Sequence, residues 1–468
     1  MALRFRTYLI GASWLVASAC SDSSLKTDPN TPPGSTPGNG TTTTKSSIDL
    51  SGDITANQTL SSKNDYLLRG IVFVKSGSTL TIEKGTTIKG EAGSKGTLVV
   101  QPGARLVAEG TADEPIVFTS QASGTDRRAG DWGGIILLGI APANIVDANG
   151  NPTKGHIEGI TTGGEFGGSN ADDDSGVLKY VRIEYAGVQL SPDNEINGLT
   201  LGGVGRGTKL SYIQVRMALD DCFEFFGGTV NADHLACQWN QDDGFDWDNG
   251  YSGKLQYLVL QQDPEFADDT NGFEGDNDAK GSTAAPQSNP TIYNATLCGK
   301  NRDVAKQQYG MLLRRNTRAH IYNTIAVGFE AGLDIRDSLT ADSAKNGGLV
   351  IQNSIFFGMV GNSSMLDQGI AYREISTVKD ALDYDDDGAF DEAAWWIGSA
   401  NHNSVTDPRI GGCFDSDAPT FGPAVPLADG AAPPNDGFFN PTATYIGAFK
   451  NADDKWATTG KWAVWSKQ

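Results

Sequence analysis

Acidic side chains that could hold a metal ion or transfer a proton are concentrated between residues 220 and 278. This segment contains fifteen Asp and Glu residues against a single basic residue, Lys254. Several of the acids belong to a short motif that recurs along the chain with offsets of 24, 22, 28, 38 and 22 residues. The copies are Asn197-Gly-Leu-Thr200, Asp221-Cys-Phe-Glu224, Asp243-Gly-Phe-Asp246, Asn271-Gly-Phe-Glu274, Tyr309-Gly-Met-Leu312 and Ala331-Gly-Leu-Asp334. Their chemistry depends on how the recurring element places them.

A period near 22 residues with short alternating strands is typical of one coil of a parallel β-solenoid. A second strand recurs with the motif, as in Leu178–Ile183 and Leu210–Val215, and a third ends in asparagine at 294, 323 and 353. The 58 glycines also disfavour a helical bundle, because each glycine costs roughly 1 kcal/mol inside a helix. We therefore expect an all-β chain, with the longer offsets accommodated as loops between coils.

Side chains alternate between the two faces of a strand, so the apolar positions of the motif predict which side chains point outward. Glu224, Asp246 and Glu274 are predicted to form one outward column, and Asp248 and Asp276 lie beside it. Equivalent positions on stacked coils lie about 4.8 Å apart. Two carboxylates at that distance repel by roughly 3.5 kcal/mol at an effective dielectric constant of 20.

Three arrangements would relieve this repulsion. Ca²⁺ could bind, because it accepts six to eight oxygen ligands in flexible geometry. One carboxyl could instead remain protonated and act as a general acid, or the side chains could spread into solvent. Arg314 and Arg336 occupy the same outward column on later coils, either as catalytic partners or paired with a nearby acid such as Asp334 or Asp337.

Five further sequence strings are distinctive: LTIEKGTTIKG, PGARLVAEGTADEPIVFTS, GDWGG, SGVLKYVRIEYAG and DDGFDWDNGYSGKLQY. They resemble a broad group of secreted bacterial lipoproteins, most of them uncharacterised, whose fold is similar to the pectin-lyase-like right-handed parallel β-helix. The resemblance covers roughly residues 60 to 360. It implies two chemistries: lyases of this fold bind uronate through calcium and use a basic residue as the base, whereas inverting hydrolases use clustered aspartates.

A separate calcium motif lies near the C-terminus. Asp383, Asp385, Asp387 and Asp391 occupy positions one, three, five and nine of an EF-hand-like loop, with Gly388 at position six. Position twelve is Ala394 in place of an acid, and Glu392 is the nearest substitute. The alternative is an acidic surface loop.

The N-terminus predicts export. Basic residues, an apolar stretch and small residues precede Cys20, which resembles a lipoprotein signal peptide over residues 1–20 that would leave Cys20 lipidated. Cleavage after Ala19 that releases a soluble protein is the alternative. Residues 21–46 predict a disordered linker, 47–360 the β-helix and 361–468 an irregular C-terminal cap.

Four further cysteines, at 222, 237, 298 and 413, allow three pairings in an oxidising compartment. Cys298 with Cys413 would join the cap to the helix, whereas Cys222 and Cys237 suit small core positions as well as a bridge. The formal net charge of −21 disfavours nucleic acid as a partner.

We therefore expect a calcium-binding β-helix at the outer membrane or cell surface that binds glycan or another envelope component. The alternative is a calcium-dependent polysaccharide lyase or glycoside hydrolase, with Glu224, Asp246, Glu274, Arg314 and Arg336 as catalytic candidates.

Overall fold

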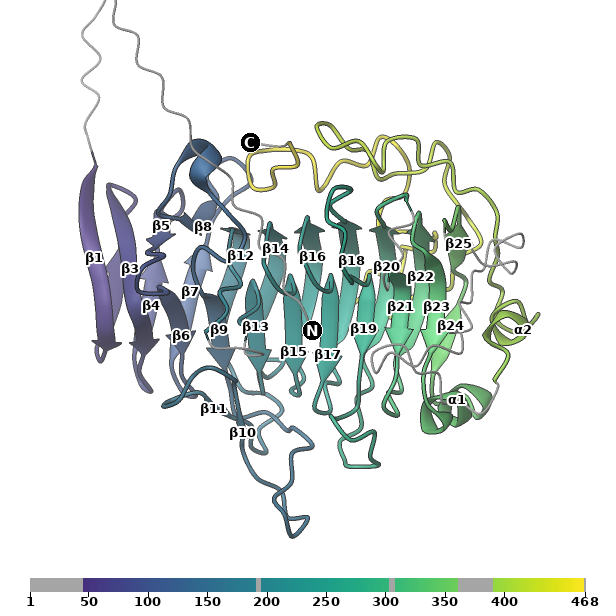
Figure 1. Ribbon diagram of the computed structural model, residues 1–468, viewed down its shortest axis with the longest axis horizontal. Coiled ribbons are helices and arrows are strands. Elements are labelled where there is room, and N and C mark those ends of the chain that lie inside the picture. Colours follow the sequence, from purple (N-terminus) through teal and green to yellow (C-terminus); the bar gives the residue numbers. More distant parts are fainter. Residues whose placement is uncertain (1–44, 191–194, 303–307, 361–389, 467–468) are drawn as a thin grey trace, which may run out of the picture. The chain divides into compact units, whose positions relative to one another are not determined.

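The computed structural model describes residues 45–190, 195–302, 308–360 and 390–466. In this part of the chain, 23 strands form one continuous sheet with parallel pairing, and the sheet winds into stacked coils (Figure 1). The structure confirms the expected parallel β-helix. Connections between parallel strands of a sheet are right-handed in nearly all proteins.

Each coil contributes to three columns of strands. The first column carries the recurring acidic motif and consists of the second half of β3 (Asn64–Val74), β6 (Thr97–Val100), β9 (Gly134–Leu138), β13 (Leu199–Gly202), β15 (Phe223–Phe226), β17 (Phe245–Asp248), β19 (Phe273–Gly275), β21 (Tyr309–Leu313) and β23 (Ala331–Ile335).

The second column consists of β2 (Gln58–Leu60), β4 (Thr79–Ile82), β7 (Arg105–Glu109), the first halves of β12 (Gly176–Glu184), β14 (Lys209–Arg216), β16 (Asn231–Gln238), β18 (Lys254–Gln261), β20 (Thr291–Cys298) and β22 (His320–Val327), and β24 (Val350–Gln352). The third column begins with β1 (Ser46–Ile54), the first half of β3, β5 (Thr87–Gly90) and β8 (Ile116–Ser120). It continues with the second halves of β12, β14, β16, β18, β20 and β22 and ends with β25 (Ile355–Phe357).

Elements outside these columns are short. An insertion after β9 pairs β10 (Gly155–His156) with β11 (Glu165–Phe166), and η1 (Gly124–Asp126) is a single turn of 3₁₀-helix. Within the described residues, two α-helices, α1 (Ser338–Lys345) and α2 (Glu392–Trp396), follow the last first-column strand.

A single residue in the left-handed conformation bends each long strand between the second and third columns. This residue is Tyr180, Tyr212, His234, Tyr257, Asn294 or Asn323, with φ between 51° and 62°. The register aligns β18 with β20 and β20 with β22 around this bend. The tyrosine and asparagine repeats therefore lie at the same bend of one set of long strands, although the sequence pattern suggested two different strands.

The apolar positions of the motif point inward, as predicted. Phe223, Phe225, Phe245 and Trp247 are fully buried, and the rings of Phe223 and Phe245 stack with centroids 5.3 Å apart. Burying a side chain of this size contributes roughly 1.5–3 kcal/mol. This core fixes the coil register and thereby which side chains emerge on the outer face.

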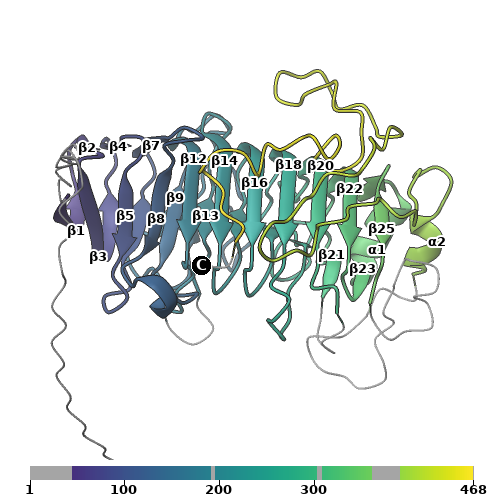
Figure 2. The same ribbon diagram turned by 90° about the horizontal axis from the view of Figure 1, so that it is seen from above.

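The C-terminal segment, residues 400–466, is mostly irregular and runs back along the outer face of the third column (Figures 1 and 2). Just before it, Trp396 of α2 stacks on Phe356 at the last coil, with ring centroids 3.6 Å apart. The C-terminal part of the chain therefore covers the last coil of the β-helix and also extends along the side of the β-helix. The disulfide between Cys298 and Cys413 is confirmed, and a second joins Cys222 to Cys237.

Candidate functional site

The three acids of the predicted column are neighbours on consecutive coils. Glu224 pairs with Asp246, and Asp246 pairs with Glu274, in the parallel register of β15, β17 and β19. We call these three residues the acidic ladder. The 22-residue period therefore predicted the alignment correctly.

Two further carboxylates reach the ladder from the turns that precede β15 and β17. Oδ1 of Asp221 accepts the backbone N–H of Asp243 at 2.7 Å, and Oδ1 of Asp243 accepts that of Asn271 at 2.6 Å. Both side chains are buried, with 6% and 3% of their residue surface exposed. These bonds tie each turn to the next coil and fix the turn carboxylates beside the ladder.

The turn and ladder acids form two trios that share Asp246. One trio consists of Asp221, Glu224 and Asp246, and the other of Asp243, Asp246 and Glu274. In each trio, one oxygen from every carboxylate lies within 4.8 Å of the others. A third cluster, Asp220, Asp221 and Asp242, adjoins them. We call the first two the central trios.

Asparagine amides on the flanking coils reach the outer members of the central trios, Glu224 and Glu274. Nδ2 of Asn197 donates to Glu224 and to Thr200 Oγ1 at 3.3 Å, and Nδ2 of Asn271 donates to Glu274 at 3.3 Å. Asp221 and Asp243 stand at the same turn position but offer no amide hydrogen. Asp246 Oδ1 is buried and has no hydrogen-bond partner in the described part of the chain.

Burial followed by repulsion from neighbouring acids raises the pKa values of these carboxyl groups. The pKa is well above its ordinary value for Asp221, Glu224, Asp242, Asp243 and Asp246. For Asp220 the pKa rises to about 7. The ionised cluster is therefore unfavourable unless protons or a cation neutralise it.

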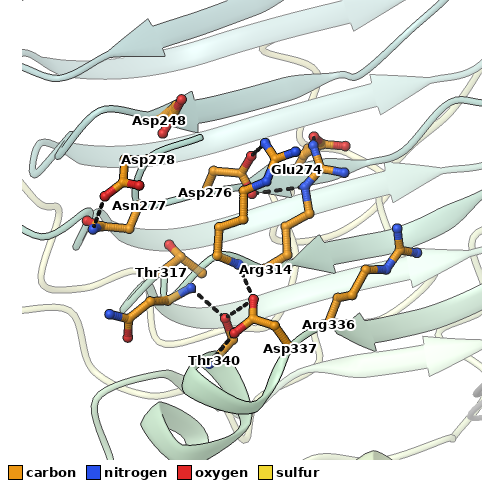
Figure 3. A network of polar contacts seen from close by, with 12 residues as sticks. Asp248, Glu274, Asp276, Asn277, Asp278, Arg314, Thr317, Arg336, Asp337 and Thr340 are labelled. Atoms are coloured by element: carbon orange, nitrogen blue, oxygen red, sulfur yellow. Dashed lines mark hydrogen bonds and ion pairs between the residues drawn. The ribbon is translucent and has the colours of Figure 1, made fainter. Parts of the chain in front are cut away.

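Arg314 and Arg315 neutralise only the edge of the cluster. Arg314 forms ion pairs with Glu274 and with Asp276, the latter at 3.0 Å (Figure 3). Arg315 contacts Asp276 at 2.5 Å. Asp276 is thus held by two guanidinium groups and belongs to neither central trio.

The remaining two predicted site residues on this face lie outside the trios. Asp248 accepts the backbone N–H of Asn249 at 2.5 Å, and burial followed by the charge of Asp276 raises its pKa to about 7. Arg336 bonds Asp334 at 2.6 Å and lies apart from the Glu274 group (Figure 3). Pairing with a neighbouring acid, one of the two roles that the sequence left open for Arg336, is the one observed.

A pocket of about 350 Å³ adjoins the ladder at Glu224. The insertion between β9 and β12 contributes Lys154, His156 and Glu158, and β15 contributes Phe226. Burial, with repulsion from Glu195, raises the pKa of Glu158. The pocket places an aromatic ring and a basic side chain next to the carboxylates.

The second calcium motif is described only at its end. Asp383, Asp385 and Asp387 lie outside the described residues, as does Cys20. Asp391 accepts the backbone N–H of Ala394 at 2.8 Å and so caps α2.

Sequence reasoning missed Asp220, Asp221, Asp242 and Asp243 as site residues. Asp221 and Asp243 are the first residues of their motif copies, so the repeat itself marked them. The inward–outward alternation of side chains applies only within strands. It therefore could not predict where the side chains of Asp221 and Asp243 point, because these residues lie in turns.

The family comparison agrees with this architecture. The model of the pectate-lyase-like β-helix domain matches residues 52–399. The chain belongs to this family. Searches of curated proteins and of solved structures returned no match. Among the described residues, no helix is long and apolar enough to cross a membrane.

Proposed function

We propose that the chain binds Ca²⁺ in the central trios and uses it to hold a glycan along the acidic ladder. The observation that carries the proposal is Asp246 Oδ1, a buried oxygen without a partner where two all-carboxylate trios meet. A divalent cation there would satisfy this oxygen and offset the repulsion among the acids.

The donor set fits calcium. All ligands are oxygens from separate side chains, and Ca²⁺ accepts six to eight oxygens at 2.3–2.6 Å without strict geometry. The burial of Asp221 and Asp243 argues against charges that spread into solvent. Protonation remains the competing explanation, and a calcium titration distinguishes it from metal binding.

The adjoining pocket supports a glycan ligand. Phe226 can pack against a sugar ring, and Lys154 can pair with a uronate carboxylate. Three protein carboxylates leave calcium with open coordination positions, which polymer oxygens would fill. A row of equivalent positions along the coils suits a linear polymer.

Binding is favoured over catalysis for two reasons. One oxygen of each trio carboxylate lies within 4.8 Å of the others, closer than the roughly 6.5–9.5 Å between the carboxyl groups of inverting glycosidases, which argues against the inverting mechanism. Arg314, the basic candidate of a lyase, is engaged by Glu274 and Asp276. An Asp246→Asn variant checks this: an enzyme would lose glycan cleavage, whereas a binding protein yields no products in either form.

The decisive experiment is calcium calorimetry on the full chain, together with melting curves in calcium and in chelator. We expect binding heat and a higher melting temperature with calcium, and both effects should be lost in Asp246→Asn. Glu265→Gln, an exposed residue outside the trios, is the control and should behave as the unmodified chain. Absence of heat together with an unchanged melting temperature in chelator would contradict the proposal.

We further propose that a lipid on Cys20 anchors the protein at the outer membrane, with residues 21–46 as a tether. Several acyl chains anchor a protein stably, since each buried CH₂ contributes roughly 0.8 kcal/mol. Labelling with a radioactive fatty acid should mark the protein and fail with Cys20→Ser. Secretion of both forms into the medium would contradict the anchor.

A further inference from the structure

A second pocket, of about 480 Å³, lies on another side of the molecule, between the long strands and the C-terminal segment. His234 of β16 and Tyr257 of β18 line it from the β-helix, and Phe439 and Trp456 line it from the segment. His234 and Tyr257 are the left-handed bend residues of their coils, so their side chains emerge where the face turns.

The aromatic part of the wall is held by stacking. The His234 ring stacks on Tyr212 at 4.1 Å, packs against Tyr257 at 4.6 Å, and meets Trp456 edge-on at 4.9 Å between centroids. Trp456 in turn stacks on Phe449 at 4.9 Å. The rings thus have defined positions before any ligand enters.

The polar part of the wall is rich in unused acceptors. Asp233 Oδ1 accepts Ser211 Oγ at 2.7 Å and contacts His234 Nδ1 at 2.5 Å. Asp454 Oδ2 accepts the backbone N–H of Lys450 at 3.1 Å. The other carboxylate oxygen of each residue, and Nε2 of His234, make no hydrogen bond within the described part of the chain.

The neighbouring amides are already paired with the protein. The backbone N–H of Asn440 donates to Gln256 Oε1 at 2.8 Å, and Nδ2 of Asn440 donates to the Tyr257 hydroxyl at 3.0 Å. These bonds join the C-terminal segment to β18 at the pocket. A ligand is therefore left with carboxylate and imidazole acceptors beside aromatic rings.

This chemistry selects the ligand class. Two carboxylates with no Lys or Arg in the lining disfavour an anion. Acceptors distributed around the wall suit a molecule with several hydroxyl donors, whereas an ammonium group presents its donors at a single point. A pyranose ring carries hydroxyls at its rim and an apolar face that can lie on an aromatic ring.

We propose that this pocket binds a neutral pyranose unit of a glycan, independently of calcium. In this assignment Asp233, Asp454 and His234 accept sugar hydroxyls, and Trp456 and Tyr257 contact the ring. The site is distinct from the acidic ladder, which we assign to a cation and the polymer that it holds.

The test is saturation-transfer NMR on the full chain in chelator, with methyl glucoside, methyl galactoside and methyl mannoside as probes. Choline and galacturonate serve as the cationic and anionic comparisons. We expect transfer to at least one neutral sugar and at least tenfold weaker binding in Asp454→Asn and in Asp233→Asn. Both variants keep a side-chain oxygen for the existing bonds while replacing the unused oxygen with an amide.

Asp453→Asn is the matched control, because this exposed neighbour of Asp454 does not line the pocket. It should bind as the unmodified chain does. Binding of choline alone, neutral-sugar binding unaffected in both Asn variants, or no transfer to any neutral probe would each overturn the proposal. Since calcium is absent throughout, failure of the acidic-ladder proposal would not affect the result.

Discussion

Two outer faces of the same β-helix bury polar side chains, but they satisfy them differently. On the third column, Gln214 exchanges two hydrogen bonds with Val464, at 2.9 and 2.8 Å, and Nε2 of Gln261 donates to the Asp415 carbonyl at 2.8 Å. On the first column, Asp246 keeps a buried oxygen without a partner in the described part of the chain. The C-terminal segment covers the former face and supplies these hydrogen-bond partners.

The difference separates structural polar groups from functional ones. A buried polar group whose partner is the chain itself stabilises the fold, and its removal should cost stability under all conditions. A buried cluster of like charges destabilises the fold until a ligand arrives, so its removal should help in the absence of ligand. Substitutions on the two faces should therefore have effects of opposite sign.

The largest effect is expected for Arg216→Met. Arg216 is fully buried, lies 3.7 Å from Glu184 and bonds Gln238 at 3.1 Å. Glu184 keeps its closer partner Arg182 at 2.7 Å, so the cost comes mainly from the acceptors of Gln238 and Ser466 that lose their donor, about 1–3 kcal/mol each, and the denaturation midpoint should fall strongly with or without calcium. Arg206→Met, which breaks the exposed pair with Asp172, should cost less than about 1 kcal/mol. Equal costs for the two variants would contradict the distinction between the faces.

On the acidic face, Asp243→Asn should increase stability in chelator, whereas Arg216→Met decreases it. It places an amide where the next coil already has Asn271, whose Nδ2 donates to Glu274. In chelator we expect a gain of about 1–3 kcal/mol, the usual contribution of a hydrogen bond to a charged group. In calcium the variant should lose the stabilisation that the unmodified chain gains. Denaturant titration in both buffers measures this, and a loss of stability in chelator would count against like-charge repulsion at this position.

The acidic face should also make stability depend on pH. Burial raises the pKa values of Asp220 and Asp248 to about 7, whereas an unfolded Asp titrates near 3.9. The folded state then holds more protons, so their stabilising contribution is complete below about pH 4, declines between about pH 4 and 7, and is absent above.

The slope is about 1.4 kcal/mol per pH unit for each proton involved. Melting curves in chelator should show this decline, and calcium, which binds the ionised carboxylates, should reduce it. A decline of the same size in an Asp220→Asn, Asp248→Asn double variant and in the unmodified chain would place its origin in other groups.

Repetition made much of the fold predictable. Coils of similar length keep side chains in register, so the alignment of Glu224, Asp246 and Glu274 followed from spacing alone. The same reasoning was misleading near the N-terminus. There, Leu80-Thr-Ile-Glu-Lys-Gly85 resembles Leu98-Val-Val-Gln-Pro-Gly103, 18 residues further on, but the two segments lie in different columns, because Leu80 pairs with Leu106.

Features without a period were not predictable. Asp221 and Asp243 depend on turn conformation, which alternation does not describe. The path of the C-terminal segment depends on contacts such as that of Arg182 with the Lys461 carbonyl, 279 residues apart, and no local pattern records such a contact. The Cys222–Cys237 bridge could not be told from two small buried residues until the coil placed them together.

The return of the C-terminal segment along the third column has a consequence for the order of folding. Its docking surface is assembled from strands of seven successive coils, β12 to β25, so it does not exist until those coils have stacked. Each coil can add to the one before it through local contacts, but the segment must wait and then close a very long loop. Formation of the Cys298–Cys413 bridge would therefore report that the segment has docked on β20.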